Sequence, residues 1–541
     1  MNKSKGVIKI NISSDALNRV GVFFERNGFA IVAAILSVIS VLSFMFYFQN
    51  GLSLAYNDAR SHLDIGRRVV EGLKPGFAQL GSVWLPLTHL LMVLTIWNDF
   101  MWHSGLAGTI WSMFGFVLTG LIIYKFLEKI GVKMTGRLIG VGIFASNLNV
   151  LYLQSTAMTE LTLVAAMTAG AYYLMLWFKD DKVVDLVKSA FWIMLSTLVR
   201  YDGWLLLVLA SMMIVFYVWK KNGYKQAEGK LILFITLAGL GIVLWFLWNL
   251  LIFGDPLYFA FGPYSARTQQ TQLEAAGVLS TKGDWFFSLK VYFYALAYNS
   301  NAFLALMGLV GAVALWFSGN IRRGVRFATF VLLAPLFFNI LALYLGHSVL
   351  FIQGLSGDTW FNARYGVMLM PTIAIFVGYL IHYVSKLRPV IIGLILFVLF
   401  FQFSSGDAVT IDDARVGSSQ KNVAEVSGWL AQNAAGKDGF VLISAASHDA
   451  IIFSSGMPMK KFIHEGTGDY WKEATTLPDH WARWIVMRTH DDNDSVWSFV
   501  SRTPGFERYD LVDSYPFADI YQLRDEYLDI LNTEPILENQ D

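Results

Sequence analysis

Long apolar stretches recur along most of this chain and constrain its fold more than any other feature. A helix that crosses a bilayer needs about 20 mostly apolar residues, because its backbone polar groups must be hydrogen-bonded within the segment itself. We identify eleven candidate spans, several of them short or close together, at residues 29–49, 104–124, 138–154, 159–178, 186–199, 203–219, 231–253, 290–317, 327–350, 366–384 and 389–404. The sequence therefore predicts a polytopic α-helical membrane protein with about 11 transmembrane helices.

The composition agrees with a membrane protein and excludes several kinds of site. Of the 541 residues, 55% are hydrophobic and 15% are charged, whereas a soluble protein carries about 25% charged residues. The formal net charge of +1 gives no reason to expect nucleic acid as a partner. The chain has no cysteine, which excludes disulfides, thiolate metal sites and cysteine nucleophiles. A basic segment precedes the first full-length apolar stretch, so we expect that stretch to stay as an anchor.

The lysines and arginines between the apolar stretches predict the orientation. With eleven spans, the basic loops near residues 125–137, 179–188, 220–230, 322–326 and 386–388 all fall on the same side as the basic N-terminus. Basic loops mark the cytoplasmic side of a membrane protein. We therefore expect the N-terminus in the cytoplasm and residues 50–103, 155–158, 200–202, 254–289 and 351–365 outside.

Beyond residue 404 the sequence changes character, because charged residues return and the apolar runs become short. Residues 440–444, 461–464, 484–487 and 520–523 have the pattern of strands, and residues 423–435 and 494–500 that of helices. Strands that alternate with helices are typical of an α/β domain. We expect a transmembrane domain at 1–404 and an extracytoplasmic α/β domain at 405–541.

The first outer loop contains an amphipathic segment at residues 55–73. As a helix, it places Arg60, Asp64, Arg67, Arg68 and Glu71 on a face expected to be solvated, since their spacings favour ion pairs. Asp58 and His62 fall on the apolar face. Asp58 could simply cap the helix. The functional alternative is a carboxylate that takes a proton from a substrate at the membrane boundary.

Other ionisable residues occur where the apolar stretches meet the outer loops. They are Glu160, Arg200, Asp202 and Arg364, and Tyr365 follows the last of them. Each arginine could be an ordinary interfacial residue or part of a structural ion pair. As a set they fit sugar transfer from a lipid phosphate, because arginine binds phosphate with forked hydrogen bonds and a carboxylate can deprotonate a hydroxyl.

The loop that follows the seventh apolar stretch, at residues 253–265, is rich in aromatic residues and includes Tyr264. These side chains could line a groove for a prenyl chain, or they could anchor the loop at the membrane boundary. His347 and His448 have no partners at the spacing of metal ligands, so the metal signal in the sequence is weak.

Taken together, these motifs resemble the GT-C superfamily of polyprenyl-phosphate-sugar-dependent membrane glycosyltransferases, in particular its mannosyltransferase and aminoarabinose-transferase branch. The resemblance rests on Tyr56 to His62, Gly81 to His89, Thr159-Glu160, Arg200 to Trp204, Trp248 to Tyr258, and Arg364-Tyr365. It implies that Asp58 is the catalytic base and that transfer inverts the anomeric carbon. It also implies substrate-binding roles for His62, Glu160, Arg200, Asp202, Tyr264, Arg364 and Tyr365, with Arg200 or Arg364 on the donor phosphate.

We therefore expect an enzyme of a prokaryotic cytoplasmic membrane that moves a monosaccharide from a polyprenyl-phosphate donor to a hydroxyl on a glycan, lipid or protein. Many members of the superfamily carry two adjacent acids where this chain has Asn57-Asp58, and no cofactor is assigned. The alternatives are an oligosaccharyltransferase with a divalent metal held by Asp58 and Glu160, a lipid or sugar transporter, and a sensor with an outer ligand-binding domain.

Overall fold

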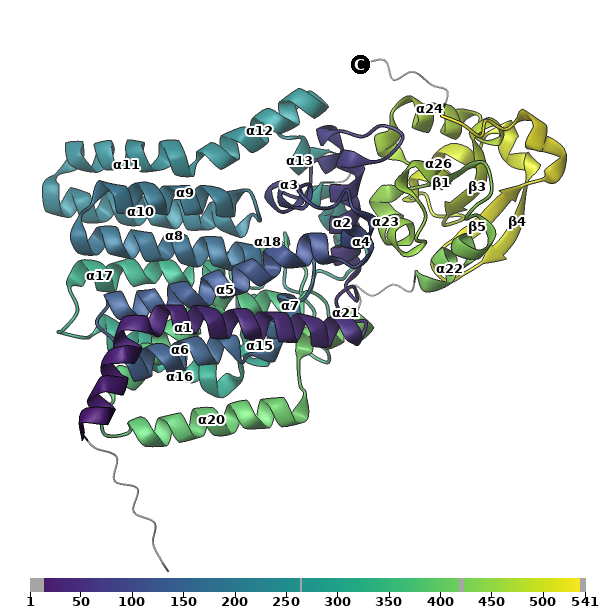
Figure 1. Cartoon of the computed structure of the whole chain (residues 1–541). Helices are drawn as coiled ribbons and strands as arrows, with labels where there is room; N and C mark the ends of the chain where they lie inside the picture. The colour runs from purple at the N-terminus through teal and green to yellow at the C-terminus, as the bar shows by residue number, and fades with distance from the viewer. Residues whose placement is uncertain (1–13, 263–264, 418–422, 536–541) are drawn as a thin grey trace, which may run out of the picture.

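The computed structural model describes residues 14–262, 265–417 and 423–535, and it consists of a helical bundle with a smaller sheet domain at one end (Figure 1). The predicted fold class, a helical membrane protein with a C-terminal α/β domain, is confirmed. We call the end of the bundle beside the sheet the domain end. The helices α2 (Asn57–Val70), α4 (Asp99–His103) and α23 (Ala445–Ser454) lie where the two parts meet.

Within the described residues, seven helices are long and apolar enough to cross a membrane, or nine if each of two bent pairs is one span. The main helices are α1 (Ser14–Gln49), α5 (Leu106–Lys129), α8 (Glu160–Asp180), α10 (Asp202–Asn222), α17 to α18 (Arg323–Leu345), η3 to α19 (Ala363–Tyr383) and α20 (Arg388–Ser405). The bent pairs are α11 with α12 (Tyr224–Ala238 and Leu240–Phe253, 46°) and α15 with α16 (Trp285–Ser300 and Ala302–Trp316, 105°).

The other two expected spans are helical but shorter than a bilayer crossing. Helix α9 (Val183–Thr197) has 15 residues, and α6 (Met134–Ala145) has 12. The segment expected at 138–154 is interrupted because the Asn147 side chain accepts a hydrogen bond from the amide of Val150 and starts a new helix, α7 (Leu148–Leu153).

The centre of the bundle is formed by α8 and the α19 segment, whose most apolar windows are 83% and 89% buried, whereas those of α1 and α20 are 17% and 11% buried. Glycines allow the central helices to approach closely. A Cβ atom on Gly311 of α16 would lie 2.1 Å from the carbonyl oxygen of Phe376 in α19. Small residues at helix contacts are the usual way for membrane helices to pack.

The basic loops gather at the end of the bundle away from the sheet domain, as the sequence predicts. Lys179 donates to the carbonyl oxygen of Lys129, Arg322 donates to that of Lys179, and the amide of Lys133 donates to the His382 ring. The loops near residues 130, 180, 322 and 382 therefore lie side by side.

The domain end is built from short helices and loops. Besides α2, α4 and α7 they are η1 (Phe77–Leu80), α3 (Leu87–Met92), α13 (Tyr258–Phe261), α14 (Ala266–Ala275), η3 (Ala363–Leu369) and α21 (Val409–Val416). Helix α21 follows the last long helix but turns back onto the bundle, where it packs against α7 and η3.

The C-terminal domain has a five-stranded sheet in the order β2-β1-β3-β5-β4. Its strands are β1 (Phe440–Ile443), β2 (Phe462–Ile463), β3 (Ala482–Met487), β4 (Tyr509–Ser514) and β5 (Asp519–Leu523), and its main helices are α22 (Ala424–Asn433), α23, α24 (Asp469–Thr476) and α26 (Ser495–Val500). The first three strands are parallel, and β5 is antiparallel to both β3 and β4. The sequence patterns predicted all strands except β4, an edge strand that is mostly exposed and so lacks the apolar signal of a buried strand.

We expect Gly311→Ala to destabilise the bundle by about 1–3 kcal/mol, because the added methyl group overlaps backbone atoms that cannot move independently. Thermal unfolding of the detergent-purified protein measures this effect. Gly142→Ala is the control, since a Cβ atom on Gly142 of α6 meets nothing within 4 Å. Equal unfolding temperatures for the two variants would contradict this close packing of α16 on α19.

Candidate active site

Asp58 lies in the first turn of α2 at the domain end, but it does not cap the helix. The N-cap position is Tyr56, and no side chain makes a capping hydrogen bond there. The Asp58 carboxylate instead points to Arg364, with its Oδ2 atom 2.6 Å from Nη2 of the guanidinium. The Asp58 side chain is 36% exposed and that of Arg364 is 3% exposed. One edge of a buried guanidinium is therefore closed by a carboxylate that faces outward.

Arg364 is the centre of the cluster. Its Nε atom donates to Oε1 of Glu160 at 3.0 Å, and its Nη1 atom lies 3.7 Å from Oδ2 of Asp413. The rings of Tyr56 and Tyr365 lie 4.9 and 5.4 Å from its central carbon. Three carboxylates from three separate elements thus surround one guanidinium that is in contact with two aromatic rings. A buried charge requires such partners, since an uncompensated one is strongly destabilising.

Asp413 is a site residue that the sequence analysis missed. It belongs to α21 and is fully buried, and the Tyr56 hydroxyl donates to its Oδ2 atom at 3.0 Å. The neighbouring Thr410 is fixed to the bundle, because its amide and hydroxyl both donate to Oδ1 of Asn149 in α7. The sequence feature that could have indicated Asp413 is the acid pair Asp412-Asp413, which comes a few residues after the last apolar stretch.

Arg200 joins the same cluster from the other side. Its guanidinium lies 3.5 Å from Glu160 Oε1 and 3.4 Å from Asp202 Oδ2, and it stacks 4.8 Å from the Tyr365 ring centre. These ion-pair distances are longer than those of Arg364 to Asp58 and Glu160, and the Arg200 side chain is 22% exposed. Arg200 is therefore the more accessible of the two arginines.

Glu160 connects the two arginines. Its Oε1 atom faces both guanidinium groups, and its Oε2 atom is buried without a hydrogen-bond partner among the described residues. Buried acceptors of this kind are rare in folded proteins and commonly receive a water or a ligand hydroxyl. Oε2 is therefore a position at which a bound hydroxyl would be favoured.

His62 lies one turn beyond Asp58 on α2. Its Nδ1 atom is 2.8 Å from Nε2 of His89, and its ring centre is 4.3 Å from that of Trp84. The pKa of His62 is lowered to about 3, because burial excludes water from the ring and because the positive charges of Arg200 and Arg364 lie nearby. Burial also lowers the pKa of His89, so both rings are neutral at physiological pH.

The structure brings most of the predicted site residues into one cluster. Asp58, Glu160, Arg200, Asp202, Arg364 and Tyr365 are linked by direct contacts, and His62 lies beside them. Tyr264 lies outside the described residues. The residues that were not predicted are Asp413, Tyr56 and His89. The cluster has four carboxylates against two guanidinium groups.

No metal site is formed by this set. Among residues 14–262, 265–417 and 423–535, no group of three or more histidine, aspartate or glutamate side chains could hold a metal ion. The two acids that the sequence analysis proposed as metal ligands, Asp58 and Glu160, are both hydrogen-bonded to Arg364.

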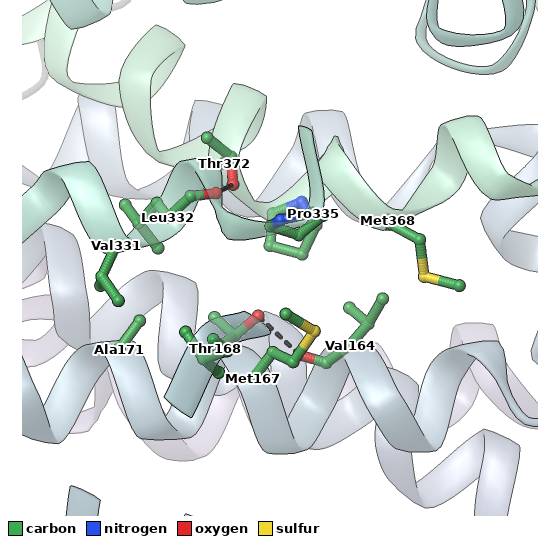
Figure 2. Close-up of a pocket in the computed structure, with 11 residues that line it drawn as sticks. Val164, Met167, Thr168, Ala171, Val331, Leu332, Pro335, Met368 and Thr372 are labelled. Atoms are coloured by element: carbon green, nitrogen blue, oxygen red, sulfur yellow. Dashed lines mark hydrogen bonds between the residues drawn. The ribbon is translucent and has the colours of Figure 1, made fainter. Parts of the chain in front are cut away.

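An apolar cavity lies within the bundle, lined in part by α8 and the η3–α19 segment (Figure 2). Val164 and Met368 of its wall lie four residues beyond Glu160 and Arg364, respectively. Its two hydroxyl groups are satisfied, since Thr168 donates to the carbonyl oxygen of Val164 and Thr372 to that of Leu332. The cavity therefore offers hydrocarbon surface and no free polar group.

The other face of α2 packs against the C-terminal domain, which corrects the expectation of a solvated face. Asp64, Arg67 and Arg68 are all buried. Asp64 accepts a hydrogen bond from the Trp102 indole, and Arg68 pairs with Asp449 of α23 at 3.0 Å. Burial raises the pKa of both carboxyl groups, of Asp449 to about 6.

Comparison with known proteins identifies the fold. No protein-family model matches the chain, and no curated protein matches it. Among solved structures, ArnT from Cupriavidus metallidurans matches in its apo state and bound to undecaprenyl phosphate, with TM-scores of 0.53 and 0.51 and 11% identity. The alignments cover 95% and 93% of this chain and 99% of ArnT. The archaeal oligosaccharyltransferase AglB from Archaeoglobus fulgidus matches with a TM-score of 0.49 and 10% identity, over 86% of this chain and 69% of AglB.

The fold and the site together define a class of protein. The chain is a multi-pass membrane protein with a buried arginine–carboxylate cluster at the domain end of its bundle. It has the GT-C fold, shared over nearly its whole length with ArnT.

We expect His62→Gln to weaken the dependence of stability on pH below about 6.5. In the unfolded chain His62 takes up a proton near its ordinary pKa of about 6.5, whereas the folded protein leaves it neutral down to about pH 3. Its contribution to stability is thus complete above pH 6.5 and falls with the pH by up to about 1.4 kcal/mol per unit.

Unfolding temperatures at pH 7.5, 6 and 5 measure this change. His347→Gln is the control, because His347 is exposed. If wild type and His62→Gln lose stability equally between pH 7.5 and 5, His62 is not held neutral by the fold.

Proposed function

We propose that this protein is an inverting glycosyltransferase that moves a monosaccharide from a polyprenyl-phosphate donor to a hydroxyl acceptor. The observation that carries this proposal is a cluster that contains both an outward-facing carboxylate, Asp58, and a more accessible guanidinium, Arg200, on helices that also line an apolar cavity. The GT-C fold supports it, since ArnT was solved with undecaprenyl phosphate bound.

Asp58 is the proposed general base. Its Oδ2 atom is bonded to Arg364, which fixes the carboxylate, while its partial exposure leaves the group accessible to an acceptor. The acceptor oxygen attacks the anomeric carbon, its proton passes to Asp58, and the bond between that carbon and the phosphate oxygen breaks. A single base suffices for this direct displacement, which inverts the configuration.

Arg200 is the proposed phosphate ligand. The leaving polyprenyl phosphate gains a negative charge as the bond breaks, and a fixed guanidinium stabilises that charge. Arg364 is less suited to this role, because it is almost fully buried and its charge is already surrounded by three carboxylates.

The remaining residues have supporting roles in the proposal. Glu160 offers its unpartnered Oε2 atom to a hydroxyl of the sugar or the acceptor. Asp202 and Tyr365 hold Arg200 in place. His62, which is neutral, presents a hydrogen-bonding ring beside Asp58. We place the site on the outer face of a prokaryotic cytoplasmic membrane, with the N-terminus in the cytoplasm, because the basic loops gather at the opposite end of the bundle.

We expect Asp58→Asn to lower kcat for sugar transfer by about 10²- to 10⁴-fold, the usual contribution of a general base. Transfer of radiolabelled sugar from polyprenyl-phosphate donors to membrane acceptors, by purified protein in detergent, provides the measurement. Asp358→Asn is the matched control, since Asp358 is exposed in the loop before Arg364. Full turnover by a normally folded Asp58→Asn protein would remove Asp58 from the base role.

Arg200→Ala should weaken binding of the lipid phosphate itself. Loss of a hydrogen bond between charged groups costs about 1.5–3 kcal/mol, so we expect about 10- to 100-fold weaker binding of polyprenyl phosphate, measured by fluorescence titration. Lys221→Ala, at the opposite end of α10, is the control. Unchanged affinity in Arg200→Ala would assign the phosphate to another group.

A further inference from the structure

One alternative from the sequence is an oligosaccharyltransferase with a divalent metal ion, shared by Asp58 from the first outer loop and Glu160 from the second. The Arg364 guanidinium lies at the position expected for that ion. In the structure the same two carboxylates are shared by Arg364, through Nη2 at 2.6 Å and Nε at 3.0 Å. One carboxylate oxygen of each acid is therefore already hydrogen-bonded to the guanidinium of Arg364.

We propose that Arg364 replaces a divalent metal in this site, and that the protein binds and transfers its substrate without one. This inference rests on the proposed function, since it concerns the same site. It makes Arg364 a positioning residue for Asp58 and Glu160 and leaves the substrate phosphate to Arg200.

The carboxylates at this position are not free to hold a metal ion. Magnesium at a phosphate site is usually held by one or two carboxylates together with waters and substrate phosphates, and both carboxylates here already pair with Arg364. Among the described residues no third histidine or carboxylate side chain joins Asp58 and Glu160 in a ligand set. The Oε2 atom of Glu160 is unpartnered, but a dication on that oxygen would lie close to the guanidinium bonded to Oε1. Such like charges repel strongly where water is excluded.

Arg364 is not free to move aside. It is almost fully buried, it lies close to the rings of Tyr56 and Tyr365, and its Nη1 atom faces Asp413. Glu160 and Asp413 are themselves fully buried. If the guanidinium left, both of these carboxylates would lose a nearby cation, which is strongly unfavourable in a buried site.

This replacement also restricts the donor. A divalent ion can neutralise the several charges of a diphosphate leaving group, whereas the one accessible cation described at the cluster is the single charge of Arg200. A monophosphate donor, whose leaving group carries fewer charges, fits this arrangement. The inference therefore favours polyprenyl monophosphate sugars over the diphosphate-linked donors of the alternative hypothesis.

Manganese binding tests the inference without any measurement of turnover. Purified wild-type protein and Arg364→Ala are titrated with Mn²⁺, and free Mn²⁺ is followed by electron paramagnetic resonance. We expect at least about tenfold tighter binding by Arg364→Ala than by wild type, a difference easily resolved in such titrations. We expect Arg364→Ala/Glu160→Gln to lose that gain. Arg137→Ala, at the opposite end of the bundle, is the control.

Chemical rescue provides a second readout. Guanidinium ion added to Arg364→Ala should restore part of the sugar transfer, whereas methylammonium, with equal charge but no planar fork of donors, should not. If Arg364→Ala does not fold, Arg364→Gln is used for both experiments. Wild-type transfer is also measured after chelation with EDTA, and its rate should change by less than about twofold. Disturbing the residues around an essential metal ion typically lowers metal affinity or activity 10- to 100-fold.

The proposal that Arg364 replaces a metal ion is overturned if wild type binds Mn²⁺ and Asp58→Asn or Glu160→Gln abolishes that binding. It is also overturned if chelation stops sugar transfer and added Mn²⁺ restores the transfer. Failure of the proposed function is distinguishable, because a protein that transfers no sugar at all still reports through the Mn²⁺ titration. Sugar transfer from a diphosphate-linked donor, with none from a monophosphate donor, would overturn only the proposed preference for a monophosphate donor.

Discussion

A buried guanidinium that needs three carboxylates determines how the domain end of this protein is assembled. Arg364 follows a loop and begins the most buried membrane segment, and its partners come from α2, α8 and α21. None of these elements is close to another in sequence. Because a desolvated charge is tolerated only when its partners are in place, the cluster couples the first outer loop, the start of a central helix and the segment after the last span.

The two arginines differ in burial, and the roles proposed for them follow from this difference. Arg364 is buried and close to its carboxylate partners, so its positive charge is neutralised within the protein. Arg200 has longer contacts and more exposure, so part of its hydrogen-bonding capacity is open to a ligand. Sequence spacing could not distinguish them, because both arginines occur at the ends of apolar stretches and both precede a tyrosine.

What the sequence predicted here follows from strong physical constraints, and what it missed follows from tertiary contacts. Charged residues at membrane boundaries are costly, so Asp58, Glu160, Asp202 and the arginines were recognisable as a set. The face of α2 that carries Asp64 and Arg68 was predicted to be solvated, because helical spacing reveals ion pairs along one helix but not a second domain that covers them. Asp413 was missed because it lies beyond the last apolar stretch, in a part of the chain assigned to a separate domain.

Helix α21 and helix α23 bring the last quarter of the chain into the part of the protein that carries the acids. Helix α21 supplies Asp413 to Arg364, and α23 contacts the helix that carries Asp58 through the ion pair of Arg68 with Asp449. The sheet domain is therefore not an independent module. A chimera that exchanged it for the corresponding part of a distant relative would leave Arg68 of α2 without Asp449, the partner that the sheet domain supplies.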